Sequence, residues 1–430
     1  MVNFSPFIQL HVNPSAESPL KATLLVAQPI IDTLHNYITE LIQGQARVDG
    51  FAPGQAPVQY IKTAYQPVVQ GYVKEFLLRH PIRKCITQGL HQCKIIGIGE
   101  PLLISCEIDP AKEGCFEFIV AVLQPQPVGD WRKLYLKAPE RKNYKDLDRQ
   151  VELFLKEESE KATLPQADAI QPGDWVNFEL CLQCSSHACL QDIIDTLWIK
   201  IGDEDADRIA QETFVGKKIG DTLCGSQEFL QEYFGHTPCY NVCITIKNIV
   251  SPSYFSIEQF KKQFRLKTGR ELHQKLIEVF SFRNDISQRR ETIEAAYKTL
   301  MPNFTIDLSN DLIEYQQEAV LAILRLNPDY YVYKAQKDFK EKVRGLAIKQ
   351  LKELAITDYI ALHENIQVTE EDIHCYLNLL KRPRTKEFIY FEFPTSKVNG
   401  QEATIPAELL QLYCLREKTL NAIIYQLTKK

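Results

Sequence analysis

The sequence has little of several features that mark common classes of protein. It contains only two methionines in 430 residues, and its formal net charge is −5, so no global positive field attracts nucleic acid. No stretch approaches the ~20 apolar residues that a membrane-spanning helix needs. The start of the chain lacks the basic and apolar regions of a secretory signal. We therefore expect a cytoplasmic protein that binds neither DNA nor membrane.

Motifs for nucleotide-driven or nucleophilic chemistry are missing as well. The sequence has no glycine-rich phosphate loop. Its nine histidines are scattered, and none lies in a recognisable triad with a nucleophile and an acid. We therefore expect no cofactor and no nucleotide-dependent cycle.

Cysteine, in contrast, is plentiful, with twelve residues spread along the chain. Without a secretory signal, this distribution favours buried thiols in a reducing compartment over a disulfide framework. The segment CLQCSSHAC has the residue types of a zinc site in Cys181, Cys184, His187 and Cys189. Structural zinc sites usually draw their second ligand pair from a distant segment, and Cys181 falls within a predicted strand. We therefore favour a cysteine-rich strand and flap over a metal site.

Length and hydrophobic periodicity predict an α+β protein with several domains, because 430 residues exceed what one core usually serves. An α+β first domain is predicted at 1–128, a linker strand and charged helical arm at 129–164, a small β-rich domain at 165–252, and an all-helical domain at 253–430. Within the first domain we expect strands at 20–27, 94–99, 102–108 and 115–123, a helix from Pro29, and a second helix at 68–77 that kinks near His80-Pro81.

The last domain carries clear helix-start signals. Ser256, Asp307 and Thr369 each precede an apolar-periodic segment. Residues 333–362 are predicted to hold one long helix, whose apolar stripe needs neighbours to cover it. The stretch KEFIYFEFPTSKVNG at 386–400 breaks this pattern with a strand-and-turn composition that has no local explanation.

The turn GFAPGQAP at 50–57 lies between two helical segments, and its prolines and glycines suit a rigid loop. On its own it is either a connector or an exposed tip. In its context it resembles the ribosome-docking signature G-F-R-x-G-K-x-P of the trigger factor family, a group of bacterial ribosome-associated chaperones. The matching residues are Arg47, Gly50, Phe51, Gly54 and Pro57. Ala52 and Gln55 stand where the signature has its two cations, which predicts weakened docking.

The predicted middle domain resembles the FKBP-type prolyl isomerase module of the same family. The likeness rests on GDWVNFEL, on LWIKIG and on FVGKKIGDTL, and within them on Gly202, Phe214, Gly216, Gly220 and Asp221. The module's I-P-G-F-E helix start falls on residues 207–211, where Pro-Gly-Phe is missing. The resemblance therefore implies an isomerase whose activity is weak or absent.

Together these resemblances imply an ATP-independent chaperone that holds newly made or unfolded polypeptides and docks on the ribosome near the exit tunnel. Two alternatives stay open. One is a prolyl isomerase as the main activity, which requires an aromatic-lined pocket between 165 and 250. The other is a non-catalytic interaction protein with one stable partner.

Overall fold

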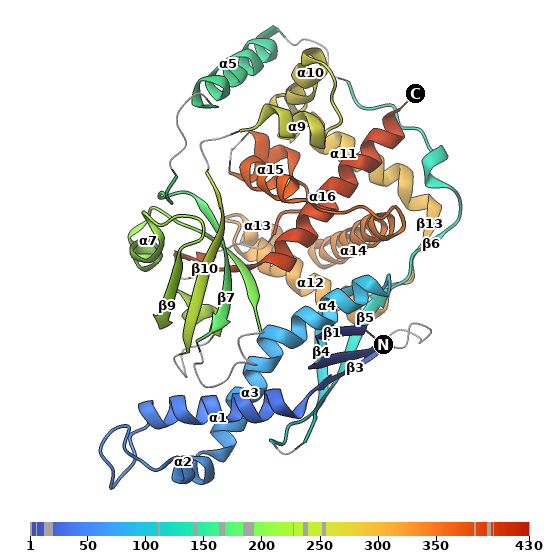
Figure 1. Cartoon of the computed structure of the whole chain (residues 1–430). Coiled ribbons are helices and arrows are strands. Elements are labelled where there is room, and N and C mark those ends of the chain that lie inside the picture. Colours follow the sequence, from blue (N-terminus) through green and yellow to red (C-terminus); the bar gives the residue numbers. More distant parts are fainter. Residues whose placement is uncertain are drawn as a thin grey trace.

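The computed structural model describes residues 2–5, 7–12, 20–110, 112–140, 145–162, 168–183, 193–226, 228–234, 240–251, 255–381, 384–393, 397–398 and 400–429. We keep the names first, middle and helical domain for the ranges predicted above. In Figure 1 the first domain lies at the bottom, the middle domain at the left and the helical domain above them. The fold is mixed α+β, as predicted. No helix in these ranges is long and apolar enough to cross a bilayer.

The first domain is built on a five-stranded antiparallel sheet in the order β1-β2-β3-β5-β4. Its strands are β1 (Val2–Ser5), β2 (Ile8–Val12), β3 (Leu20–Val26), β4 (Ile96–Glu107) and β5 (Gly114–Leu123). The prediction of two strands at 94–99 and 102–108 is wrong. A single strand β4 spans both, because shifts of register against β5 absorb the Gly99–Pro101 interruption.

Helices cover one side of this sheet and extend beyond it (Figure 1). They are α1 (Gln28–Gln45), α2 (Val58–Ala64), α3 (Gln66–Leu77) and α4 (Arg83–Gln92). Between α3 and α4 the chain widens into a π-helical turn over Leu78–Ile82. Pro81 lies in that turn and cannot donate a backbone hydrogen bond, which accounts for the predicted kink.

The middle domain is a second antiparallel sheet, in the order β16-β8-β7-β10-β9. Its own strands are β7 (Trp175–Leu182), β8 (Asp195–Lys200), β9 (Thr222–Ser226) and β10 (Asn241–Val250), with α7 (Arg208–Phe214) and α8 (Gln231–Phe234) beside them. The fifth strand, β16 (Ile405–Pro406), comes from the helical domain and pairs with Trp198 and Leu197 of β8.

The helical domain contains most of the remaining helices. They are α9 (Ile257–Gln263), α10 (Gly269–Phe280), α11 (Gln288–Leu300), α12 (Asn310–Arg325), α13 (Tyr330–Lys334), α14 (Phe339–His363), α15 (Glu370–Leu380) and α16 (Ala407–Thr428). The charged arm α5 (Lys145–Ala162) packs on α10 and buries Val151. Short strands pair as β11 (Phe282–Arg283) with β12 (Ile286–Ser287), β6 (Gln126–Pro127) with β13 (Phe304–Thr305), and β14 (Lys397–Val398) with β15 (Gln401–Glu402).

The helix-start predictions are confirmed at two of three positions. Ser256 caps α9, and Thr369 forms a capping box with Asp372 at α15. Asp307 is wrong as a cap, because the hydroxyl of Ser309 accepts the hydrogen bond from Leu312 N at 3.3 Å. The single long helix predicted at 333–362 is also wrong, since α13 ends at Lys334 and a turn over 335–338 precedes α14.

Residues 386–393, the first part of the stretch that interrupted the helical pattern, lie within the helical domain. Thr385–Phe388 forms a 3-10 turn, and the carboxylate of Glu417 then accepts hydrogen bonds from the backbone N–H groups of Tyr390 and Phe391. Burial raises the pKa of Glu417 to about 7. A side chain from α16 thus satisfies the backbone donors of Tyr390 and Phe391, which need neither helix nor sheet, whereas Lys397–Val398 pairs as β14.

Candidate functional site

A buried polar cluster joins the first domain to the middle domain. His80 Nδ1 lies 3.1 Å from Asp195 Oδ2, and the Tyr233 hydroxyl donates to the same oxygen at 2.8 Å. The rings of Phe76 and Phe234 pack on His80, with centroids 4.7 and 5.0 Å away. Burial alone would raise the pKa of Asp195, but the hydrogen bonds from His80 and Tyr233 hold it below its usual value. We call His80, Asp195 and Tyr233 the latch.

A second set of contacts joins the middle domain to the helical domain. Residues 397–398 and 400–406, which we call the clasp, contain β14, β15 and β16. Asp207 Oδ1 accepts from the backbone N–H of Glu402 at 2.7 Å, and Lys200 pairs with the Glu402 carboxylate at 3.2 Å. Lys397 pairs with Glu204 at 2.6 Å. The clasp therefore lies against the start of α7 and extends the sheet at β8.

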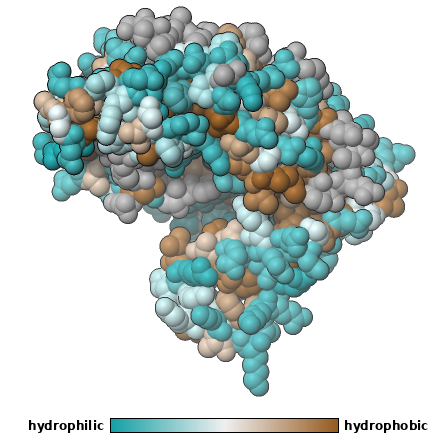
Figure 2. Space-filling view, turned by 90° about the horizontal axis from the view of Figure 1, so that it is seen from below, coloured by the Kyte–Doolittle hydropathy of each residue, from teal (hydrophilic) through white to brown (hydrophobic). Residues whose placement is uncertain are grey.

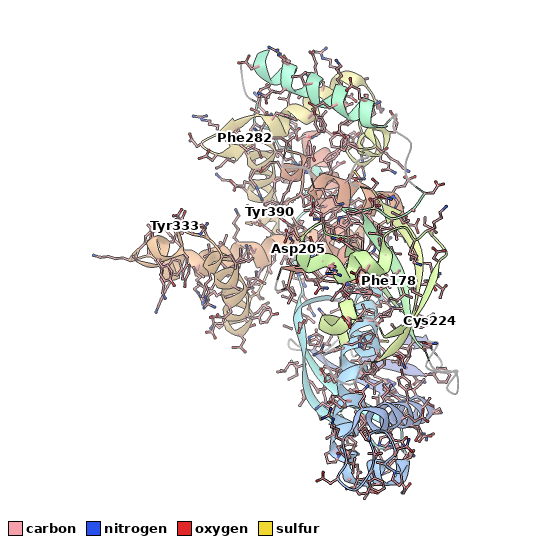
Figure 3. The ribbon with its side chains drawn as sticks, turned by 90° about the vertical axis from the view of Figure 1, so that its left-hand side faces the viewer. Phe178, Asp205, Cys224, Phe282, Tyr333 and Tyr390 are labelled. Atoms are coloured by element: carbon pink, nitrogen blue, oxygen red, sulfur yellow. A yellow bond between two sulfur atoms is a disulfide. The ribbon has the colours of Figure 1, made fainter. Side chains whose placement is uncertain are left out.

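The residues carried over from the isomerase resemblance lie in two places. Phe214 packs in the core, with its ring centroid 5.5 Å from Phe178 and 5.1 Å from Phe229. All three rings are almost fully buried and touch one another, so they leave no space for a proline ring between them. Figure 3 shows Phe178 inside the domain. Ala210 is buried beside them, at the position where the resemblance expects an aromatic ring.

The other matched residues shape turns. Gly216 and Gly220 have φ angles of +81° and +92°, which glycine adopts without strain. Asp221 Oδ2 accepts from the backbone N–H of Lys218 at 2.8 Å and closes the turn before β9. Gly202 lies so close to Asp207 that an added Cβ would be 1.8 Å from its carboxylate. These residues therefore explain the local backbone and contribute no reactive group.

The turn at 50–57 forms a tip of the molecule, between the end of α1 and the start of α2 (Figure 1). Gly50 and Gly54 have φ angles of +88° and +75°. Phe51 and Tyr60 are 41% and 45% exposed, and their ring centroids lie 5.8 Å apart. Pro57 is the residue before α2, and Arg47 is exposed near the tip. The tip presents the aromatic pair of Phe51 and Tyr60, and Ala52 and Gln55 stand at the positions of the signature's cations. Tyr60 was not among the predicted docking residues.

Of the four candidate zinc residues, the structure describes only Cys181. Cys181 lies in β7, directly opposite Cys243 of β10. Cys184, His187 and Cys189 lie outside the described residues. Among the residues that are described, no group of three histidine, cysteine or acidic side chains is placed to hold a metal.

The cysteine prediction needs one correction. Cys85, Cys375 and Cys414 are buried thiols, as expected. Cys224 of β9 and Cys243 of β10, however, form a disulfide. Opposed positions on neighbouring antiparallel strands bring two cysteines close enough to bond, and sequence spacing does not show such an opposition.

An arm of α12, α13 and α14 projects from the body of the molecule, with Tyr333 near its end (Figure 3). The arm has a small core of Val320, Val343 and Ala347. Its end, in contrast, exposes large apolar side chains: Leu326 is 78% exposed, Tyr331 79% and Val332 66%. On the first domain, Leu102 and Ile104 of β4 are exposed as well. Alternation along a strand signals such residues, but sequence analysis did not single them out.

The root of the arm packs against the first domain. Ile96, Ile98 and Leu123 of the first sheet share a core cluster with Leu312 and Leu351 of the arm. In Figure 2, apolar side chains gather on both sides of the hollow between the two lobes of the molecule. A concave surface with apolar patches, interrupted by polar residues, can hold extended apolar segments of another chain.

Comparisons with known proteins identify sequence relatives of this chain. A family model described as bacterial trigger factor protein matches residues 15–154, and one described as its C-terminus matches residues 256–382. The curated trigger factor of Geobacter sulfurreducens is 20% identical over 78% of this chain and 80% of its own length. That of Desulfosudis oleivorans is 21% identical over 85% of each chain.

A solved structure of the trigger factor chaperone aligns with 97% of this chain and 100% of its own, at 15% identity and a TM-score of 0.39. The two family models cover most of the first domain, the first part of the charged arm α5 and much of the helical domain, and stop on either side of the middle domain. Two models of one family, in the family's order, match separate parts of this sequence, and the chain therefore belongs to the trigger factor family.

Proposed function

We propose that this trigger-factor-like chaperone holds unfolded or newly made polypeptides in the cytoplasm and uses the end of its arm as a main contact. One observation carries the proposal: Leu326, Tyr331 and Val332 are 78%, 79% and 66% exposed at the end of a projecting arm. A folded domain gains nothing from large apolar groups in water, whereas an unfolded chain can bury its own apolar side chains against them.

Such contacts suit a chaperone that works without nucleotide. Each apolar contact contributes ~25 cal/mol per Å² of buried surface before the cost of ordering the client is subtracted. Several weak contacts hold a client, and any of them releases without a chemical step. With only two methionines in the sequence, aromatic and branched aliphatic side chains take the role that flexible thioethers have on some promiscuous surfaces.

The arm end gives the first prediction. A variant with Leu326→Ser, Tyr331→Ser and Val332→Ser loses about 1 kcal/mol of the free energy of client binding, because less apolar surface is buried. This loss corresponds to roughly fivefold weaker affinity for the client. Light scattering of a diluted, denatured test protein should show that about five times more variant is needed for half suppression of aggregation, with no nucleotide present.

A control variant replaces three exposed polar residues of the same arm, with Lys337→Ser, Lys340→Ser and Glu341→Ser. It should suppress aggregation as the unmodified chain does. Equal thermal melting of both variants shows that the arm is folded. If the apolar variant suppressed aggregation as well as the control does, the arm end would not be the client contact.

We also propose that the tip at 50–57 docks on the ribosome near the exit tunnel, with reduced affinity. The support is its shape: both glycines have the positive φ that the turn needs, and Phe51 is presented to solvent. The two cations of the signature are absent at Ala52 and Gln55. Lys62 does not replace them at the tip, since its Nζ donates to Asn36 Oδ1 at 2.8 Å. Fewer cations neutralise fewer phosphates, so both affinity and its dependence on salt fall.

The second prediction restores the charges. Ala52→Arg with Gln55→Lys should strengthen ribosome co-sedimentation roughly thirtyfold, at about 1 kcal/mol for each exposed contact, and should steepen the salt dependence. The matched control adds the same charges to exposed positions of α4, as Thr87→Arg with Gln92→Lys. Tight binding by the unmodified chain, with no gain on restoration, would mean that other residues dock it.

For the middle domain we propose a spacer that contributes client surface and little catalysis. A prolyl isomerase holds a twisted X-Pro amide in a water-poor aromatic pocket and lowers a barrier of ~20 kcal/mol. The contact of Phe178, Phe214 and Phe229 with one another and the small Ala210 argue against such a pocket here.

The third prediction follows from this filled core. A protease-coupled assay with a prolyl peptide should give turnover at least about a hundredfold below that of an intact FKBP-type domain measured in parallel, since one misplaced or missing contact in a site costs factors of this size. Turnover comparable to the intact domain would show that the middle domain is an enzyme after all.

A further inference from the structure

Three cysteines form a row across neighbouring strands of the middle sheet. Cys243 of β10 is directly opposite Cys181 of β7 on one side and Cys224 of β9 on the other. Directly opposed residues of antiparallel strands point to the same face of a sheet. The three sulfur atoms therefore share one face, and we call these residues the cysteine row.

The row lies on the outer face of the sheet. Leu180 and Leu182, which flank Cys181 in β7, are buried in the core, so Cys181 points the other way. The next row on the outer face is polar: Thr222 contacts the hydroxyl of Thr245, and Glu179 forms an ion pair with Lys247. Thiols on this face are therefore open to reagents from solvent.

Accessibility increases from the inner strand to the edge strand. Cys181 is half-buried, and its thiol contacts the carbonyl oxygen of Cys243 at 3.8 Å. Cys224 is exposed on β9, the last strand of the sheet, and its Cα lies 4.2 Å from that of Cys243. Figure 3 shows Cys224 at the rim of the middle domain. The disulfide is thus presented at an edge, where an incoming sulfur can reach it.

We propose that Cys181, Cys224 and Cys243 form a thiol–disulfide exchange site that reacts with accessible thiols. Two further points support this assignment. Disulfides in reducing compartments are usually transient, and exposed ones are the labile or catalytic ones. A third cysteine aligned with the bonded pair is also what internal exchange requires, and Cys181 supplies it on the same face of the sheet.

The chemistry conserves bonds and electrons. An external thiolate attacks Sγ of Cys224 and forms a mixed disulfide, and the Cys224–Cys243 bond breaks with its electron pair leaving on Cys243. That thiolate either takes a proton from water or attacks Cys224 and expels the external thiol. A second external thiolate, attacking the external sulfur of the mixed disulfide, releases a free disulfide and leaves both cysteines reduced.

Internal exchange uses the third cysteine. The thiolate of Cys181 attacks Sγ of Cys243, which forms Cys181–Cys243 and releases Cys224 as a thiolate at the exposed edge. Burial raises the pKa of Cys181, so its thiolate is scarce at neutral pH and this internal step is slower than attack at the edge.

The test is a redox titration of the full chain with mixtures of reduced and oxidised glutathione. After an acid quench, free thiols are counted by maleimide mass tags, and disulfides are located by proteolysis and tandem mass spectrometry. We expect the chain to lose two thiols reversibly, in the Cys224–Cys243 pair. Cys224→Ser should instead form Cys181–Cys243, and Cys181→Ser should keep the original pair. Cys93→Ser, a half-buried cysteine of the first domain, should leave the original map unchanged.

Three results would overturn the proposal. Cys224 and Cys243 could stay as thiols in the most oxidising mixture, the bond could survive a large excess of reduced glutathione in the folded chain, or Cys243 in Cys224→Ser could fail to pair with Cys181. Equal melting temperatures of the variants exclude misfolding as a cause.

A parallel experiment with a reduced, unfolded cysteine-containing protein distinguishes the source of the thiol. Mixed disulfides with that protein indicate client thiols, and their absence limits the site to small thiols.

Discussion

The pairing of β16 with β8 is the contact on which the arrangement of the three domains depends. Residues 405–406 follow the middle domain by more than 150 positions, yet they form its fifth strand. The pairing covers an edge that would otherwise present unpaired backbone groups. The latch binds the first residue of the same strand, Asp195, so β8 is attached to both other domains, and motions at the domain joints must break buried hydrogen bonds.

The clasp and the missing isomerase motif involve the same residues. Asp207 stands at the first position of the motif, and its carboxylate now accepts the backbone N–H of Glu402. The same carboxylate lies so close to Gly202 that any side chain at position 202 would clash with it. The start of α7 is thus occupied by an attachment to the helical domain, and the core beneath it is filled by aromatic rings. The attachment at Asp207 and the filled aromatic core are the two observations on which our proposal of a spacer role rests.

Local patterns predicted local structure well. Apolar periodicity indicated α1 and the strand that contains Cys181, capping residues marked α9 and α15, and the glycines of GFAPGQAP required the turn that is observed. The prediction of two strands instead of β4 failed because a bulge can carry a strand through Gly and Pro. The latch, the clasp and the disulfide could not be predicted, since each joins residues whose proximity is set by tertiary packing. His80 and Asp195, for example, are 115 positions apart and carry no pattern that relates them.

Amide hydrogen–deuterium exchange of the full chain, resolved to segments by mass spectrometry, tests most directly whether the middle domain is held in place. If β16 is a permanent strand, the segment 195–200, in which residues 197 and 198 are paired on both sides, should exchange roughly tenfold more slowly than residues 222–226 of the edge strand β9. Residues 403–407 should show matching protection. Exchange of 195–200 as fast as that of the edge strand, together with an unprotected 403–407, would mean that the clasp opens freely and that the middle domain is not fixed.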